Sequence, residues 1–292
     1  MLSWLIEPLE FEFMRQAIAI GLSLGILGAV VGSYLILQQM GMMSDVIAHA
    51  VLPGISIAFF FDKNIAVGAF IAGVLGALVV MGIQRRSRIK VDAAMALTLS
   101  SFLAMGVILI TTLKTDRINL NDILFGDILG VTMGDVWRTV IITVVILVLT
   151  KLFYKELEFY TFDPLGAKAC GLPVDLLYLG LICAITLTIV ASMQTVGVLL
   201  VMSLLVGPAI TAYLLVKELF PMMFVGSIIG MISTVAGMYS SYYFDLPSGP
   251  AIVMVIFVFF LLTLLFSPSQ GLLTEPELKS KILNYLNRSI GK

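Results

Sequence analysis

The chain has 292 residues, of which 60% are hydrophobic and 12% are charged. A soluble domain is about 45–50% apolar and about 25% charged, so this composition excludes a soluble globular protein and a disordered chain. Seventeen Lys and Arg residues against 18 Asp and Glu residues give a net charge of −1, so the chain has no basic field to attract nucleic acid.

Nine apolar stretches follow one another along the chain, and each is long enough to form a membrane helix. At about 20 residues per crossing, nine spans occupy most of the sequence. The sequence therefore predicts an all-α, polytopic transmembrane helix bundle of about nine spans, within a range of eight to ten. The spans are expected at 14–37, 45–61, 65–83, 93–112, 136–153, 175–193, 196–216, 221–241 and 249–266.

The orientation of these spans follows from the Lys and Arg residues of the loops, because cytoplasmic loops carry the excess of positive charge. If the spans alternate, 12 of the 17 basic residues fall on one side, in the loops at 84–92 and 151–174, at Lys217 and in the C-terminal tail. That side is predicted to be the cytoplasm. The predicted divisions are an extracytoplasmic N-terminal segment 1–13, a transmembrane domain 14–266 and a cytoplasmic tail 267–292.

The second stretch holds an ionisable pair. Asp45 and His49, the only histidine of the chain, are four residues apart and therefore share one face of a helix. A carboxylate beside an imidazole can bind a divalent cation or relay protons, and ionisable groups inside a membrane are usually functional. In the alternative interpretation, Asp45 caps the helix and His49 pairs with it. Because Pro53 and Gly54 follow, the stretch can be a broken or half-crossing helix.

One Asp and one His are too few for a complete cation site. Twofold homodimers are the commonest oligomers, and two copies of this face across such an axis supply two carboxylates and two imidazoles. That set suits borderline to hard divalent ions without selecting one of them.

The long inner loop KELEFYTFDPLGAKACGLPVD is too polar to cross a membrane. Asp163 followed by Pro164 is a signal for the start of a helix, and Gly171 is a signal for its end. The loop therefore predicts a short cytoplasmic helix on which a cytosolic partner can dock. The alternative is an ordinary connecting loop.

Four segments together resemble one family. SDVIAHAVLPG, which begins at residue 44, is similar to a signature of the permease subunits of bacterial ABC importers for manganese, zinc and iron. TFDPLGAKACGL resembles the coupling loop of that family, and ASMQTVGVLLVMSLLVGPAITAYLL and DLPSGPAIV resemble two of its later helices. The matches run from about residue 14 to 266. Gly207 before Pro208 and Cys170 before Gly171 depart from the family pattern.

The resemblance implies a permease fold of the type II ABC importers, in the plasma membrane of a bacterium. It also implies a homodimer, a pair of cytosolic ABC ATPases, an extracytoplasmic metal-binding protein and surrounding membrane lipid. The metal would be transported cargo rather than a permanently bound cofactor, with Mn²⁺ favoured by the stretches FGDILGV and MGMMSDVIAHAVLPG. The implied metal ligands are Asp45 and His49, and the implied ATPase-coupling residues are Asp163, Pro164, Ala167, Lys168 and Gly171.

Other functions stay open at this point. The same fold serves Zn²⁺ and Fe²⁺ importers, and a secondary transporter could use the Asp45–His49 pair as a proton relay. The coupling loop disfavours a secondary transporter, which has no need of a cytosolic helix there. No GxxxxGK[ST] motif occurs, so ATP hydrolysis would belong to a separate partner. A single His without an accompanying nucleophile also gives no support for an enzyme.

Overall fold

Helices form the regular structure of the described part of the chain, which comprises residues 3–113, 126 and 128–267 of a computed structural model. Three of the helices are short, namely α1 (Ser3–Glu10), α8 (Tyr154–Phe162) and α9 (Pro164–Ala169). The long helices are α2 (Glu12–Leu37), α3 (Met43–Phe60), α4 (Ile65–Arg86), α5 (Val91–Thr112), α7 (Met133–Leu152), α10 (Val174–Val196), α11 (Val198–Leu215), α12 (Leu219–Phe244) and α13 (Ser248–Phe266).

Within the described residues, these nine long helices are long and apolar enough to cross a membrane. The prediction of an all-α bundle with about nine spans is therefore confirmed, and each predicted span overlaps one helix. The C-terminal tail after Ser267 and part of the FGDILGV stretch lie outside the described residues.

Helix α3 is continuous through Pro53, so the interpretation of this stretch as a broken helix is wrong. A proline removes one backbone hydrogen bond, but membrane helices tolerate this where their neighbours pack closely. Gly106 of α5 provides the close packing, because a Cβ atom there would lie 3.3 Å from Pro53 Cδ and 2.7 Å from Leu52 Cβ. The proline-containing turn is buried against α5.

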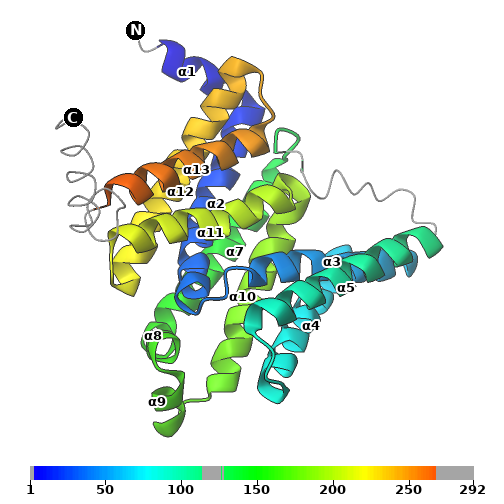
Figure 1. The fold of residues 1–292 in the computed structure, drawn as a ribbon. Coiled ribbons are helices and arrows are strands. Elements are labelled where there is room, and N and C mark those ends of the chain that lie inside the picture. The colour runs from blue at the N-terminus through cyan, green and yellow to red at the C-terminus, as the bar shows by residue number, and fades with distance from the viewer. Residues whose placement is uncertain (1–2, 114–125, 127, 268–292) are drawn as a thin grey trace, which may run out of the picture.

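The long helices form two groups joined by α10 (Figure 1). In one group, α2 packs against α7, α11 and α12, and α13 packs on α11 and α12. In the other group, α3 packs against α4 and α5. Helix α10 contacts α2, α7 and α11 of the first group and α3 and α4 of the second. The ionisable pair on α3 thus belongs to a three-helix unit that borders the rest of the bundle.

Glycines bring the backbones of α3 and α4 into direct contact. A Cβ atom on Gly54 would lie 2.2 Å from the carbonyl oxygen of Gly68, and a Cβ atom on Gly76 would lie 2.4 Å from Ala50 Cβ. Small residues allow such close approach between membrane helices, whose association depends on van der Waals contact. Any larger side chain at Gly54 would separate the two helices.

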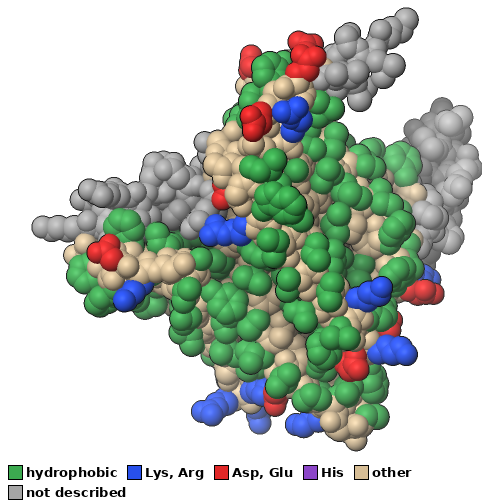
Figure 2. Space-filling view, turned by 180° about the vertical axis from the view of Figure 1, so that it is seen from behind, with side chains coloured by type: hydrophobic (Ala, Val, Ile, Leu, Met, Phe, Trp, Pro, Cys, Tyr) green, Lys and Arg blue, Asp and Glu red, His purple; other side chains and the backbone are tan. Residues whose placement is uncertain are grey.

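The face shown in Figure 2 carries many apolar side chains, as expected for helices that face lipid. Lys and Arg side chains gather mainly toward the lower end of the molecule in that view, the end where Figure 1 places α8 and α9. An ion pair between Arg85, at the end of α4, and Asp175, at the start of α10, brings two of the predicted basic loops together. The structure therefore places both loops at the same end of the bundle.

Candidate functional site

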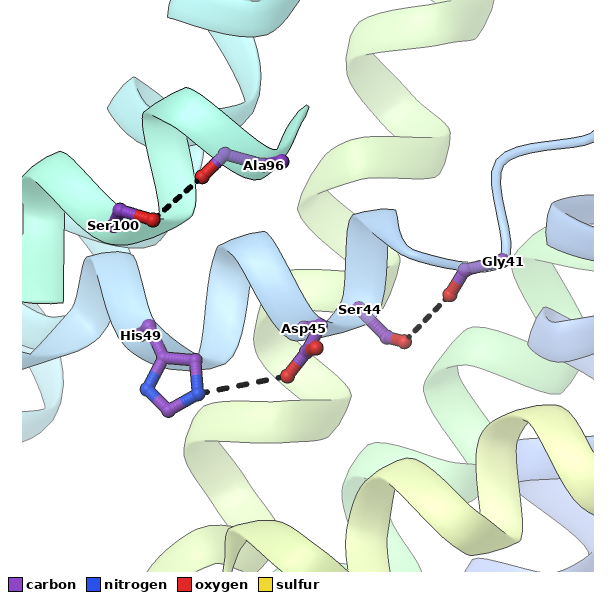
Figure 3. A network of polar contacts seen from close by, with 6 residues as sticks. All are labelled: Gly41, Ser44, Asp45, His49, Ala96 and Ser100. Atoms are coloured by element: carbon purple, nitrogen blue, oxygen red, sulfur yellow. Dashed lines mark hydrogen bonds and ion pairs between the residues drawn. The ribbon is translucent and has the colours of Figure 1, made fainter. Parts of the chain in front are cut away.

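Asp45 and His49 lie on one face of α3, as the sequence spacing predicted (Figure 3). His49 Nε2 lies 3.5 Å from Asp45 Oδ1, which is long for a hydrogen bond between charged groups. The side chains of Asp45 and His49 remain 41% and 20% exposed, respectively. Because the pair is loosely joined and open on one side, the carboxylate and the imidazole can both turn toward a third group.

The structure does not support the alternative that Asp45 caps the helix. The N-cap of α3 is Met42, which makes no side-chain capping hydrogen bond, and Asp45 lies within the first turn. Ser44 fixes the entry to the helix instead, because its hydroxyl donates to the carbonyl oxygen of Gly41 at 3.0 Å. The carboxylate of Asp45 benefits from the helix dipole at this position but is not needed to satisfy the backbone.

A cavity of about 650 Å³ adjoins Asp45 and reaches α11 and α13. Its polar lining includes Gln39, Ser44 and Ser203, together with a second carboxylate, Asp92, in the first turn of α5. Asp92 was not predicted as a site residue, although its position directly after the basic loop and at the start of an apolar span is visible in the sequence. His49 is not part of this lining, so Asp45 is the member of the pair that faces the cavity.

One copy of the chain does not assemble a complete metal site in its described part. No group of three or more His, Cys, Asp or Glu side chains there could hold a metal ion. Transition metals are held by about four to six ligands, and a neutral imidazole with a carboxylate is a suitable partial set for several of them. Within the described residues, the Asp45–His49 pair is therefore at most a partial metal site.

The predicted short helix is α9, and its two ends have the expected geometry. Asp163 is the N-cap, with Oδ1 accepting a hydrogen bond from the backbone N–H of Gly166 at 2.8 Å, and Pro164 occupies the first turn. At the other end, Gly171 has a φ of +82°, and its N–H donates to the carbonyl oxygen of Lys168 at 3.1 Å. The N–H of Leu172 donates to Ala167 O at 3.0 Å, which completes a Schellman motif.

The face of α9 that points outward is partly apolar. Ala167 is fully buried against the rest of the chain, whereas Leu165 is 82% exposed and Lys168 is exposed. Phe162, at the end of α8, is also exposed. An exposed leucine and phenylalanine beside a lysine, at the polar end of a membrane protein, are a surface on which another protein can bind.

Two side-chain contacts join the region from α8 to the start of α10 to the helices on either side of α3. Gln38 Nε2, at the C-terminal end of α2, donates to Thr161 Oγ1 of α8 at 3.3 Å. Arg85 of α4 pairs with Asp175, which begins α10. The first contact joins α8 to α2, and the second joins α10, which follows α9 along the chain, to α4.

Helix α8 also carries an internal polar contact. The hydroxyl of Tyr154 donates to Glu158 Oε1 at 3.0 Å. Loss of solvation, together with this nearby carboxylate, raises the pKa of Tyr154 to about 12. The phenol therefore stays a neutral hydrogen-bond donor at physiological pH and holds the Glu158 carboxylate against α8.

Comparison with known proteins gives consistent results. The profile of the ABC 3 transport family matches residues 10–267. The chain is 41% identical over 265 residues to the "Manganese transport system membrane protein MntC" of Listeria monocytogenes, covering 91% of this chain and 94% of that protein. It is 36% identical to the "Chelated iron transport system membrane protein YfeD" of Yersinia pestis, over 89% of this chain and 88% of that protein.

A solved structure supports the same assignment of fold. The structure described as "PsaBC from Streptococcus pneumoniae in complex with Fab" superposes with a TM-score of 0.82 at 38% identity. The match covers 92% of this chain and 98% of that one.

Proposed function

This chain belongs to the ABC 3 transport family, and on that premise we propose that it is the membrane-spanning permease subunit of an ATP-driven importer of Mn²⁺. The observation that carries the proposal is the Asp45–His49 pair, open on one side of α3 and next to a cavity within a bundle of apolar helices. The manganese transport protein of Listeria monocytogenes, at 41% identity over nearly its whole length, favours Mn²⁺ as the cargo.

The working unit is a homodimer. Each copy contributes Asp45 and His49, so a twofold axis near α3 gathers two carboxylates and two imidazoles. The partial exposure of both side chains in the single chain supports this arrangement, because a complete internal site would bury them. Asp92 lines the cavity beside Asp45 and adds a second negative charge for a cation on its way through.

The energy for transport comes from a partner protein that hydrolyses ATP. A pair of cytosolic ABC ATPases binds at α9, where Asp163, Pro164 and Gly171 fix the helix, Ala167 anchors it, and Lys168 and Leu165 face outward. An extracytoplasmic metal-binding protein delivers the cation from the other side. This chain carries no nucleotide-binding motif and contributes the transport pathway alone.

The decisive experiment measures metal uptake in the bacterium that makes this protein, with and without the chain. We expect loss of the chain to abolish high-affinity Mn²⁺ uptake and a plasmid copy to restore it. Zn²⁺ and Fe²⁺ uptake in the same cells distinguishes the alternative cargoes, of which iron is named for the Yersinia pestis relative. Uptake that is driven by a proton gradient after ATP depletion would instead identify a secondary transporter.

The topology gives a separate prediction. Helix α4 is long enough, at about 33 Å, to cross the hydrocarbon core, so its two ends should face opposite sides of the membrane. On a Cys170→Ser, Cys183→Ser background, we expect Lys63→Cys to react with a membrane-impermeant maleimide added to intact cells. Arg88→Cys should react only after permeabilisation. The reverse labelling pattern would place the C-terminal tail outside.

A further inference from the structure

We propose that a groove between α7, α8 and α12 is a binding site for an anionic glycerophospholipid such as phosphatidylglycerol. The groove has a volume of about 820 Å³, which is enough for a headgroup and the upper part of the acyl chains. It lies apart from the cavity beside Asp45 and shares no lining residue with it.

The rim of the groove is basic. Lys151 lies in the last turn of α7 and Lys155 in the first turn of α8, and both side chains are exposed. Within the described residues, neither ammonium group forms an ion pair with a carboxylate. Two unpaired lysines at the polar end of a membrane span are the arrangement that attracts a lipid phosphate.

A carboxylate on the same rim limits which headgroup fits. Glu156 lines the groove beside the two lysines, whereas the Glu158 carboxylate is engaged by the hydroxyl of Tyr154. Glu156 repels a bare phosphate but accepts hydrogen bonds from hydroxyl groups. A glycerol headgroup satisfies both conditions, because its phosphate meets the lysines while its hydroxyls meet Glu156.

The floor of the groove is apolar and continues toward the membrane interior. Phe220 and Phe224 of α12 are 66% and 61% exposed, and both line the groove together with Met223, Val30 and Leu147. A soluble anion would gain nothing from this surface, whereas an acyl chain would bury it. The basic rim and the apolar floor together favour the binding of a phospholipid over that of free phosphate.

The test compares lipid binding to the purified full-length chain in detergent. With acyl chains held the same, we expect phosphatidylglycerol to bind more tightly than phosphatidylcholine by native mass spectrometry and to raise the Tm more. The Lys151→Gln, Lys155→Gln double variant should lose phosphatidylglycerol affinity by roughly 30-fold, the factor corresponding to about 1 kcal/mol per lysine. Its phosphatidylcholine binding should stay unchanged.

The matched control is Arg88→Gln, Lys90→Gln, which removes the same charge from a loop outside the groove and should keep the lipid preference. Phe220→Ala should weaken the binding of both lipids to the same extent, because it removes only an apolar contact. Equal binding of the two lipids by the wild type, or an unchanged preference in the Lys151/Lys155 variant, would overturn the proposal. The proposal would also be overturned if inorganic phosphate raised the Tm as much as phosphatidylglycerol does. None of these readouts depends on transport, so they stand apart from the test of the metal importer.

Discussion

Asp45→Ala and His49→Ala will each reduce Mn²⁺ uptake by more than about 100-fold. Removal of an outer partner of a metal ligand already costs about 10–100-fold in metal affinity, and a ligand itself should cost more. In a homodimer, each substitution removes two ligands at once. The measurement is radioactive Mn²⁺ uptake by cells that carry equal amounts of each variant in the membrane.

The folded permease should survive these changes, which makes the result interpretable. Both side chains are partly exposed and joined only by a 3.5 Å contact, so their removal leaves no buried polar group without a partner. Asp45→Asn keeps the shape of the side chain but removes its charge, so it should also abolish Mn²⁺ uptake. Asp45→Glu should retain partial uptake. Glu10→Ala, an equal loss of charge elsewhere, is the control. Normal uptake by both alanine variants would reject the site.

Gly171→Val will uncouple ATP hydrolysis from transport. The φ of +82° at Gly171 costs a β-branched residue about 1–2 kcal/mol, so the Schellman motif that ends α9 should open. A Cβ atom there meets nothing within 4 Å, so the effect comes from the backbone and not from a clash. At about 1.4 kcal/mol per factor of ten, this cost lowers the ratio of closed to open motif by about tenfold, and we expect the metal transported per ATP hydrolysed to fall with it.

This coupling ratio is measured in proteoliposomes that contain the permease, its ATPases and the metal-binding protein. Gly171→Asn is the matched control, because asparagine tolerates the left-handed conformation, and it should keep most of the coupling. The Tm of the valine variant should fall by only a few degrees, because a backbone strain of about 1–2 kcal/mol is small for a chain of this size. A normal coupling ratio in the valine variant would show that α9 only connects the neighbouring helices.

The sequence was sufficient for features that depend on local pattern. Apolar stretches of about 20 residues predicted the nine spans, and the Asp163–Pro164 start and Gly171 stop predicted α9. Membership of the metal-importer family was also predicted from short motifs and is confirmed by the family match. These features need only the residues of one segment, so a single sequence contains them.

Features that depend on tertiary contact were missed. The Gln38–Thr161 hydrogen bond joins residues 123 positions apart, and nothing in either segment indicates the other. The position of Asp92 at the start of a span is visible in the sequence, but its proximity to Asp45 follows only from the folding that places both on one cavity. The continuity of α3 through Pro53 likewise depends on a glycine of another helix, Gly106. The predicted span 175–193 agrees with the apolar span Val174–Met193, but α10 itself continues to Val196, and Gly197 alone, with a φ of +82°, separates it from α11.

The glycine contact between α3 and α4 has a mechanical consequence. A Cβ atom at Gly54 or Gly68 would overlap the facing backbone, so α3 and α4 pack backbone to backbone here, and we expect them to move as one unit. Measured from this contact at about 1.5 Å per residue, Asp45 lies about 13 Å along α3 and Arg85 about 25 Å along α4. If the α3–α4 pair rotates about this contact, a displacement of about 4 Å at Arg85 moves Asp45 by about 2 Å. This is about the length of one metal–oxygen bond. If Asp45 binds the metal ion as proposed, a displacement of this size is enough to make or break its bond to the ion.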